Sequence, residues 1–115
     1  MKFMKRDFCA LLKAGNVFIA QSDNPSEAAA KKLIYGLAQF VPEDEIQSVF
    51  LISKHLDFDT AVAAISQLGE EEYKWAGQLL FDVCTVDGEM NDAQKKLWDR
   101  FFDIYWEYND YNKAK

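Results

Sequence analysis

Apolar residues recur at the spacing of an α-helix through nearly the whole chain, and this pattern limits the fold more than any other feature. Side chains three and four positions apart are apolar in every long segment, whereas no stretch of useful length alternates as a strand does. Five glycines and two prolines are also too few for a fold built from tight β-turns. The sequence therefore predicts an all-α bundle of six to seven helices.

Turn residues and capping residues divide the pattern into segments. Asn24 is the predicted N-cap of the second helix, either Asp57 or Asp59 caps the fourth, and Asn91 with Gln94 has the spacing of a capping box. The predicted helices cover about residues 5–21, 25–40, 43–54, a fourth segment that ends before Gly69, then 70–85 and 91–108.

The length indicates a single domain over residues 1–115, with a core at about 8–106 and a polar tail at 109–115 that is expected to fray. A chain of this size buries roughly two thirds of its unfolded surface, so it needs no disulfide or metal to fold. No apolar run approaches the roughly 20 residues that cross a bilayer, so no membrane insertion is expected. Without a secretion signal, the predicted location is cytoplasmic.

The chain is acidic, with a formal net charge of -6 and a pI of about 4.7. The excess of carboxylates lies entirely in residues 58–115, because residues 1–57 are balanced. Nucleic-acid affinity comes mainly from Lys and Arg, so this balance argues against a nucleic-acid partner.

An internal repeat relates the two halves of the chain. Asp23 is followed eight residues later by Lys-Lys-Leu. The same pattern recurs 64 residues further on, where Asp87 is followed eight residues later by Lys-Lys-Leu. Each copy reads as a long apolar helix, an acidic loop and an amphipathic helix. The expectation is two similar helical hairpins that pack face to face with pseudo-two-fold symmetry.

Residues 81–92, FDVCTVDGEMND, resemble the signature of TerB-like domains, a family named for tellurite resistance. The preceding AVAAI at 61–65 and the Glu-rich start at Glu70 fit the same pattern, and IAQSDN at 19–24 is similar to a degenerate first copy. The resemblance implies an all-α fold, a role in stress or chemical resistance, and acidic clusters that hold metal. This chain departs from the family at Gln94 and Ala30, where the family carries Glu seven residues after the Asp.

The acidic loops are the first candidate site. The predicted oxygen donors, toward a divalent cation such as Ca²⁺ or Mg²⁺ or toward a basic partner, are Asp23, Asp82, Asp87 and Glu89. An EF-hand loop centred on Gly88 would place Val83 at its first position and lose the carboxylate at its twelfth, so that motif is rejected. The alternative is a solvated acidic loop in which Asp87-Gly88 serves as a turn.

The aromatic residues of the last helix are the second candidate site. Trp98, Phe102 and Trp106 are spaced four apart, beside a stripe that includes Phe101 and Ile104 and is predicted to be core. The second stripe either widens the core or forms a patch for a protein partner or a second copy, since Trp and Tyr are enriched in interfaces. Monomer and homodimer both remain open.

Enzymatic activity has little support in the sequence. The single histidine, His55, has no marked pairing with Cys9 or Cys84, and the glycines are too scattered for a phosphate loop. A hydrolase or redox enzyme that uses Cys84 is the weakest hypothesis. The predicted function is a non-enzymatic stress-resistance accessory acting through an acidic surface, and the alternative is an interaction module acting through the last helix without metal.

Overall fold

The computed structural model describes residues 1–23 and 27–113, with side chains as far as Asn109. Over these residues all regular structure is helical, which confirms the predicted fold class. The predicted cap Asn24 lies outside the described residues. The elements are α1 (Lys5–Ala20), α2 (Glu27–Ala38), the short 3₁₀ turn η1 (Glu43–Glu45), α3 (Ile46–Ser53), α4 (Phe58–Ser66), α5 (Glu70–Thr85) and α6 (Asp92–Lys113).

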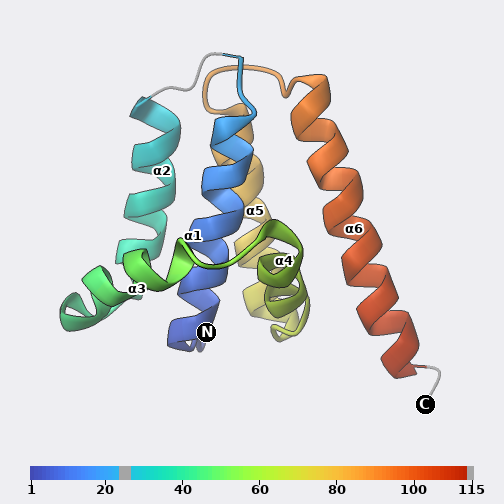
Figure 1. The fold of residues 1–115 in the computed structure, drawn as a ribbon, viewed down its shortest axis with the longest axis horizontal. Coiled ribbons are helices and arrows are strands. Elements are labelled where there is room, and N and C mark those ends of the chain that lie inside the picture. The colour runs from blue at the N-terminus through green and yellow to red at the C-terminus, as the bar shows by residue number, and fades with distance from the viewer. Residues whose placement is uncertain (24–26, 114–115) are drawn as a thin grey trace.

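Helix α1 forms the centre of the bundle (Figure 1). It packs against α2, α3, α4 and α5, while α6 lies on the far side of the bundle from α2 and packs mainly on α4. More than half of the 16 residues of α1 are buried, while Arg6, Lys13, Asn16 and Ala20 share a stripe that is not buried. The wide apolar side of α1 is stable in water only when neighbours cover it, so α2, α3, α4 and α5 pack around that side.

Most of the predicted helix ends are confirmed. The side chain of Asp57 accepts a hydrogen bond of 2.7 Å from the Thr60 N–H and so caps α4. Asn91 and Gln94 form the predicted capping box, with hydrogen bonds of 2.8 and 3.2 Å between side chains and backbone N–H groups. The predicted end of the last helix near Tyr108 was wrong, because α6 continues to Lys113. Fraying of the tail stays a prediction.

None of the helices in the described ranges has the length and apolar character that a membrane span requires.

Two glycines let α2 approach its neighbours closely. A Cβ added to Gly15 of α1 would lie 2.5 Å from a Leu33 methyl carbon, and one added to Gly36 of α2 would lie 2.6 Å from a Leu79 methyl carbon. Gly15 is therefore a packing residue. It receives the fully buried Leu33 side chain.

Helix α6 is joined to the rest of the bundle differently. The Trp98 ring packs 4.8 Å from the Phe18 ring of α1, and Tyr105 stacks at 4.5 Å on Tyr73 of α5. Long aromatic side chains thus bridge a gap between α5 and α6, and α6 diverges from the bundle toward its C-terminal end (Figure 1). The pair α1 and α2 is thus packed differently from the pair α5 and α6. Pseudo-two-fold symmetry stays a prediction.

Several buried positions of the first half of the chain have a buried counterpart 65 residues later. This spacing is one residue longer than the 64-residue spacing of the sequence repeat. Helices α1 and α5 are both 16 residues long, and they begin at Lys5 and Glu70. The pairs buried in both halves at this spacing are Leu11 and Ala76, Ala14 and Leu79, Gly15 and Leu80, Phe18 and Val83, Ala29 and Gln94, Leu33 and Trp98, and Gly36 and Phe101.

The glycine contacts lead to a stability prediction. Gly15→Ala and Gly36→Ala should each lower the free energy of unfolding by about 1–3 kcal/mol, because the added methyl group collides with a buried leucine. Gly77→Ala in α5 is the matched control, since nothing lies within 4 Å of its added Cβ. That variant should gain about 0.5–1 kcal/mol through helix propensity alone. Urea denaturation measures all three, and stabilisation by Gly15→Ala would contradict the packing argument.

Candidate functional site

The loops that follow α1 and α5 meet at the same end of the bundle (Figure 1). Residues from both loops line a polar cavity of about 180 Å³. Asp23 from the first loop lines this cavity together with Asp87 and Glu89 from the second. Gly88, between these two acids, has a φ of 127°, a conformation that glycine adopts easily. The structure therefore brings together three of the four acidic residues predicted from the sequence, and it confirms the Asp87-Gly88 turn.

Asp82 lies outside this cavity. Its carboxylate accepts a hydrogen bond of 2.8 Å from the Gln78 amide one turn earlier on α5. It lines a different hollow, beside Lys32 and Tyr35 of α2. Helical geometry explains the separation, because Asp82 lies more than one turn before the loop begins.

Among the described side chains, no three His, Cys, Asp or Glu residues are grouped closely enough to hold a metal ion. Asp23, Asp87 and Glu89 are all exposed at the cavity rim. They create a negatively charged opening and not a preformed coordination shell. Such an opening attracts cationic groups, although hard cations bind tightly only where several oxygens converge.

Two amides from the start of α6 hold the loops together. The Asn91 side chain donates a hydrogen bond of 2.6 Å to the Gln21 carbonyl, and the Gln94 amide donates one of 3.1 Å to the Phe18 carbonyl. Both acceptors belong to the end of α1, where the last carbonyls of a helix lack partners within the helix. Gln94 is buried, so its hydrogen bond is shielded from water.

Gln94 stands where the TerB-like pattern carries Glu, and its side chain has a structural role. One side-chain atom accepts from the Asn91 N–H and the other donates to Phe18, so both ends of the amide are used. A glutamate accepts in the first contact but cannot donate in the second when ionised. The Gln94 amide can therefore connect the start of α6 to the end of α1, which an ionised glutamate at this position could not do in the same way.

The cysteines are poorly placed for nucleophilic catalysis. Burial raises the pKa of the Cys84 thiol to about 11, and the neighbouring Trp98 indole offsets this rise in part. Burial also raises the pKa of Cys9. Since the thiolate is the reactive form, burial disfavours nucleophilic attack by either thiol. His55 follows α3 and is exposed, whereas Cys84 lies near the end of α5.

A second, larger hollow runs between α5 and α6. Its volume is about 440 Å³, and its lining is almost entirely apolar. We call it the α5–α6 groove, and its lining residues are Tyr73, Lys74, Gly77, Gln78, Phe81, Met90, Trp98, Phe101 and Phe102. Phe81 and Phe102 are both nearly half exposed at its edges.

The structure divides the three aromatic residues predicted to bind a partner. Trp98 is buried against Phe18 and Phe101, as the core alternative predicted, and it also lines the α5–α6 groove, so its role in binding a partner stays a prediction. Its ring reaches the core because it fills the space between α6 and α1. Phe102 and Trp106 remain exposed, and Phe102 stacks on Trp98 with ring centres 5.6 Å apart.

Sequence reasoning missed Phe81 and Gly77 on the α5 side of the groove. A glycine inside a helix costs about 1 kcal/mol relative to alanine, so such a residue signals a packing or functional reason. Nothing in the described chain occupies the space beside Gly77. That combination exposes the backbone of α5 to whatever enters the groove.

No protein-family model, curated protein or solved structure matches the chain. The resemblance to TerB-like domains therefore stays a prediction, and the functional argument depends on the geometry of the two hollows.

The role of Gln94 can be tested with a single-atom change. Gln94→Glu keeps the capping box but loses the hydrogen bond to Phe18, and it buries a charge against a carbonyl oxygen. We expect the free energy of unfolding at pH 7 to fall by about 1–3 kcal/mol. The deficit should shrink as the pH is lowered, because a protonated carboxyl again donates.

Ala30→Glu is the control for this change. It restores the other family carboxylate at an exposed position of α2, so stability should change by less than about 0.5 kcal/mol. Urea denaturation at several pH values measures both variants. Equal stability of Gln94→Glu and the native chain would show that the buried hydrogen bond is not important.

Proposed function

We propose that the protein is a non-enzymatic interaction module whose α5–α6 groove binds an amphipathic helix of a protein partner. The observation that carries the proposal is an open apolar hollow of about 440 Å³ with exposed aromatic edges. Apolar grooves of this kind receive the anchor residues of amphipathic helices, which recur at i, i+3, i+4 and i+7.

The aromatic rings of the groove supply the binding energy in this proposal. Trp98 and Phe101 form a rigid floor, since both are buried and pack 4.9 Å apart. Phe81 and Phe102 lie at opposite edges and would close over an inserted side chain. Large aromatic side chains that are already ordered lose little conformational entropy on binding, and for that reason they dominate interface energetics.

Lys74 is the charged residue that lines the groove, but the acids on the exposed side of α6 favour a basic partner. Two acids of α6 are exposed near Phe102: Asp99 lies about one turn before it and Asp103 directly follows it. The chain as a whole carries a net charge of -6. Acidic residues around an apolar centre steer cationic partners and exclude acidic ones. The resemblance to TerB-like domains supports an accessory role in stress resistance, in which the partner would be another protein of that response.

A groove-filling variant tests this proposal. Gly77→Leu places a side chain in the empty space without disturbing the core, so the fold should remain intact. The probe is a fluorescently labelled helical peptide with leucines at i, i+3, i+4 and i+7 and lysines elsewhere. Anisotropy titration should show binding to the native protein and a loss of at least about tenfold in the variant.

Glu71→Leu is the matched control, because it adds the same side chain to α5 at an exposed position outside the groove. It should bind as the native protein does, and a scrambled peptide of the same composition should not bind. Binding that survives Gly77→Leu unchanged would refute the groove as the docking site.

A second candidate function is the binding of a cation or a basic group in the polar cavity between the loops. It is favoured by one observation, namely that Asp23 from the first loop lines the same hollow as Asp87 and Glu89. Carboxylates held near one another repel, and a bound cation relieves that repulsion.

Calorimetry with Ca²⁺, Mg²⁺, Mn²⁺ and Zn²⁺ at millimolar concentration tests this second candidate. We expect a weak binding signal in the native protein that Asp87→Asn abolishes. Asp82→Asn is the control, since Asp82 lies outside the cavity, and it should leave the signal unchanged. The absence of heat with all four ions would remove cation binding from consideration.

A further inference from the structure

Helix α3 is unusually apolar for a helix at the surface. Its sequence is IQSVFLIS, yet only Val49 and Ser53 are buried. The exposed fractions of its other apolar side chains are 38% for Ile46, 39% for Phe50, 54% for Leu51 and 43% for Ile52. Ile46 and Phe50 lie one turn apart on one side of α3, and Leu51 and Ile52 lie on other sides, so much of the circumference of the helix is apolar and exposed, as at interaction sites.

One face of α3 carries opposite charges at its two ends, so it is complementary to the same face turned end to end. Gln47, Phe50, Leu51 and Lys54 are all exposed, and their spacing of i, i+3, i+4 and i+7 places them on one face. The exposed Glu43 of η1 lies one turn before Gln47. The face therefore begins with a negative charge, is apolar in its middle and ends with a positive charge.

We infer that this face pairs antiparallel with the same face of a second copy of the chain. An antiparallel arrangement around a two-fold axis places Glu43 of each copy opposite Lys54 of the other. In this register Phe50 of each copy lies at the level of Gln47 of the other, and Leu51 at the level of Ile46. A two-fold interface uses one patch twice, so the patch must be complementary to itself in this way. A parallel pairing would instead place like charges together.

The charged ends are available for this contact. Neither Glu43 nor Lys54 forms an ion pair with another described residue of the chain. Two further acids, Asp44 and Glu45, follow Glu43. The negative charge at the start of α3 thus extends over more than one residue.

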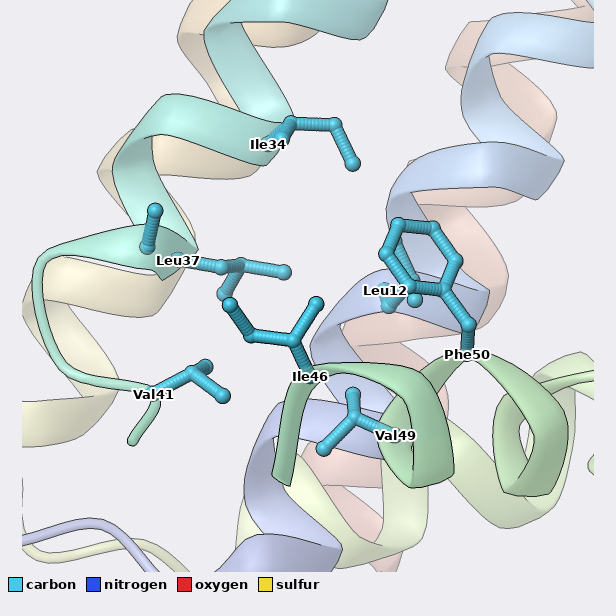
Figure 2. A pocket seen from close by; sticks show the side chains of 8 residues that line it. Leu12, Ile34, Leu37, Val41, Ile46, Val49 and Phe50 are labelled. Atoms are coloured by element: carbon cyan, nitrogen blue, oxygen red, sulfur yellow. The ribbon is translucent and has the colours of Figure 1, made fainter. Parts of the chain in front are cut away.

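The apolar surface continues from α3 onto α2. Figure 2 shows Ile46 and Phe50 beside a small hollow of about 60 Å³ whose lining is apolar. Ile34 and Leu37 of α2 and Leu12 of α1 line its other sides. A partner laid on α3 would cover this opening as well, which adds apolar contact beyond a single helix pair.

The interface is small, and this determines its strength. Stable complexes bury about 800 Å² on each partner, and a paired segment of this length supplies less than that. The dimer is therefore weak and reversible. It is also independent of the proposed function, because α3 and α6 lie on opposite sides of α1 (Figure 1).

Sedimentation velocity over a concentration series on the full chain tests the inference. The native protein should shift from monomer toward dimer as its concentration rises. Leu51→Glu places a charge within the apolar part of the contact, at the level of Ile46 of the other copy, and should weaken association by at least about tenfold. Phe102→Glu is the matched control, since Phe102 is exposed to a similar degree on the other side of the molecule, and it should dimerise normally.

Charge reversal tests the antiparallel arrangement. Lys54→Glu should weaken association by about tenfold at low salt, because it places Glu43 opposite another acid. The double variant Glu43→Lys with Lys54→Glu should restore it, and circular dichroism confirms that each variant folds. A native protein that stays monomeric at every concentration overturns the dimer. Failure of the double variant to recover overturns the antiparallel pairing.

Discussion

The burial of the wide apolar side of α1 is the constraint on which the rest of the structure depends. The buried residues of α1 need neighbours on several sides, and α2, α3, α4 and α5 supply them. Helix α6 adds to this cover through single large side chains, above all the contact of Trp98 with Phe18. The positions of α2, α3, α4 and α5 follow from the need to cover this side of α1.

Side-chain size at the helix contacts explains why the bundle has a groove on one side only. Gly15 of α1 receives Leu33 of α2, so these helices pack closely. At the corresponding positions, 65 residues later, stand Leu80 and Trp98, which prevent the same approach of α5 and α6. The resulting gap is bridged by aromatic rings and remains open between them. The difference between the two halves thus supports a binding function that a symmetric bundle would lack.

The loop end of the molecule shows how one side chain changes what an acidic loop does. Asp23, Asp87 and Glu89 line the cavity, but the Gln94 amide donates its hydrogen bond to the Phe18 carbonyl. The loops are therefore held by neutral hydrogen bonds, and the carboxylates stay at the rim. This arrangement favours contact with mobile cationic groups over a rigid metal centre, and it leaves the groove as the stronger candidate.

Periodicity and capping determined the secondary structure from sequence alone. The all-α fold, the bounds of α5, the Asp57 cap and the Asn91–Gln94 capping box all follow from interactions between residues close in the chain. Only the tertiary structure decided that Trp98 is core while Phe102 is exposed, that Asp82 leaves the acidic cluster, and that Gly77 faces an open groove. These outcomes depend on how far apart two helices pack, and that distance is determined by side chains remote in sequence, which no local pattern records.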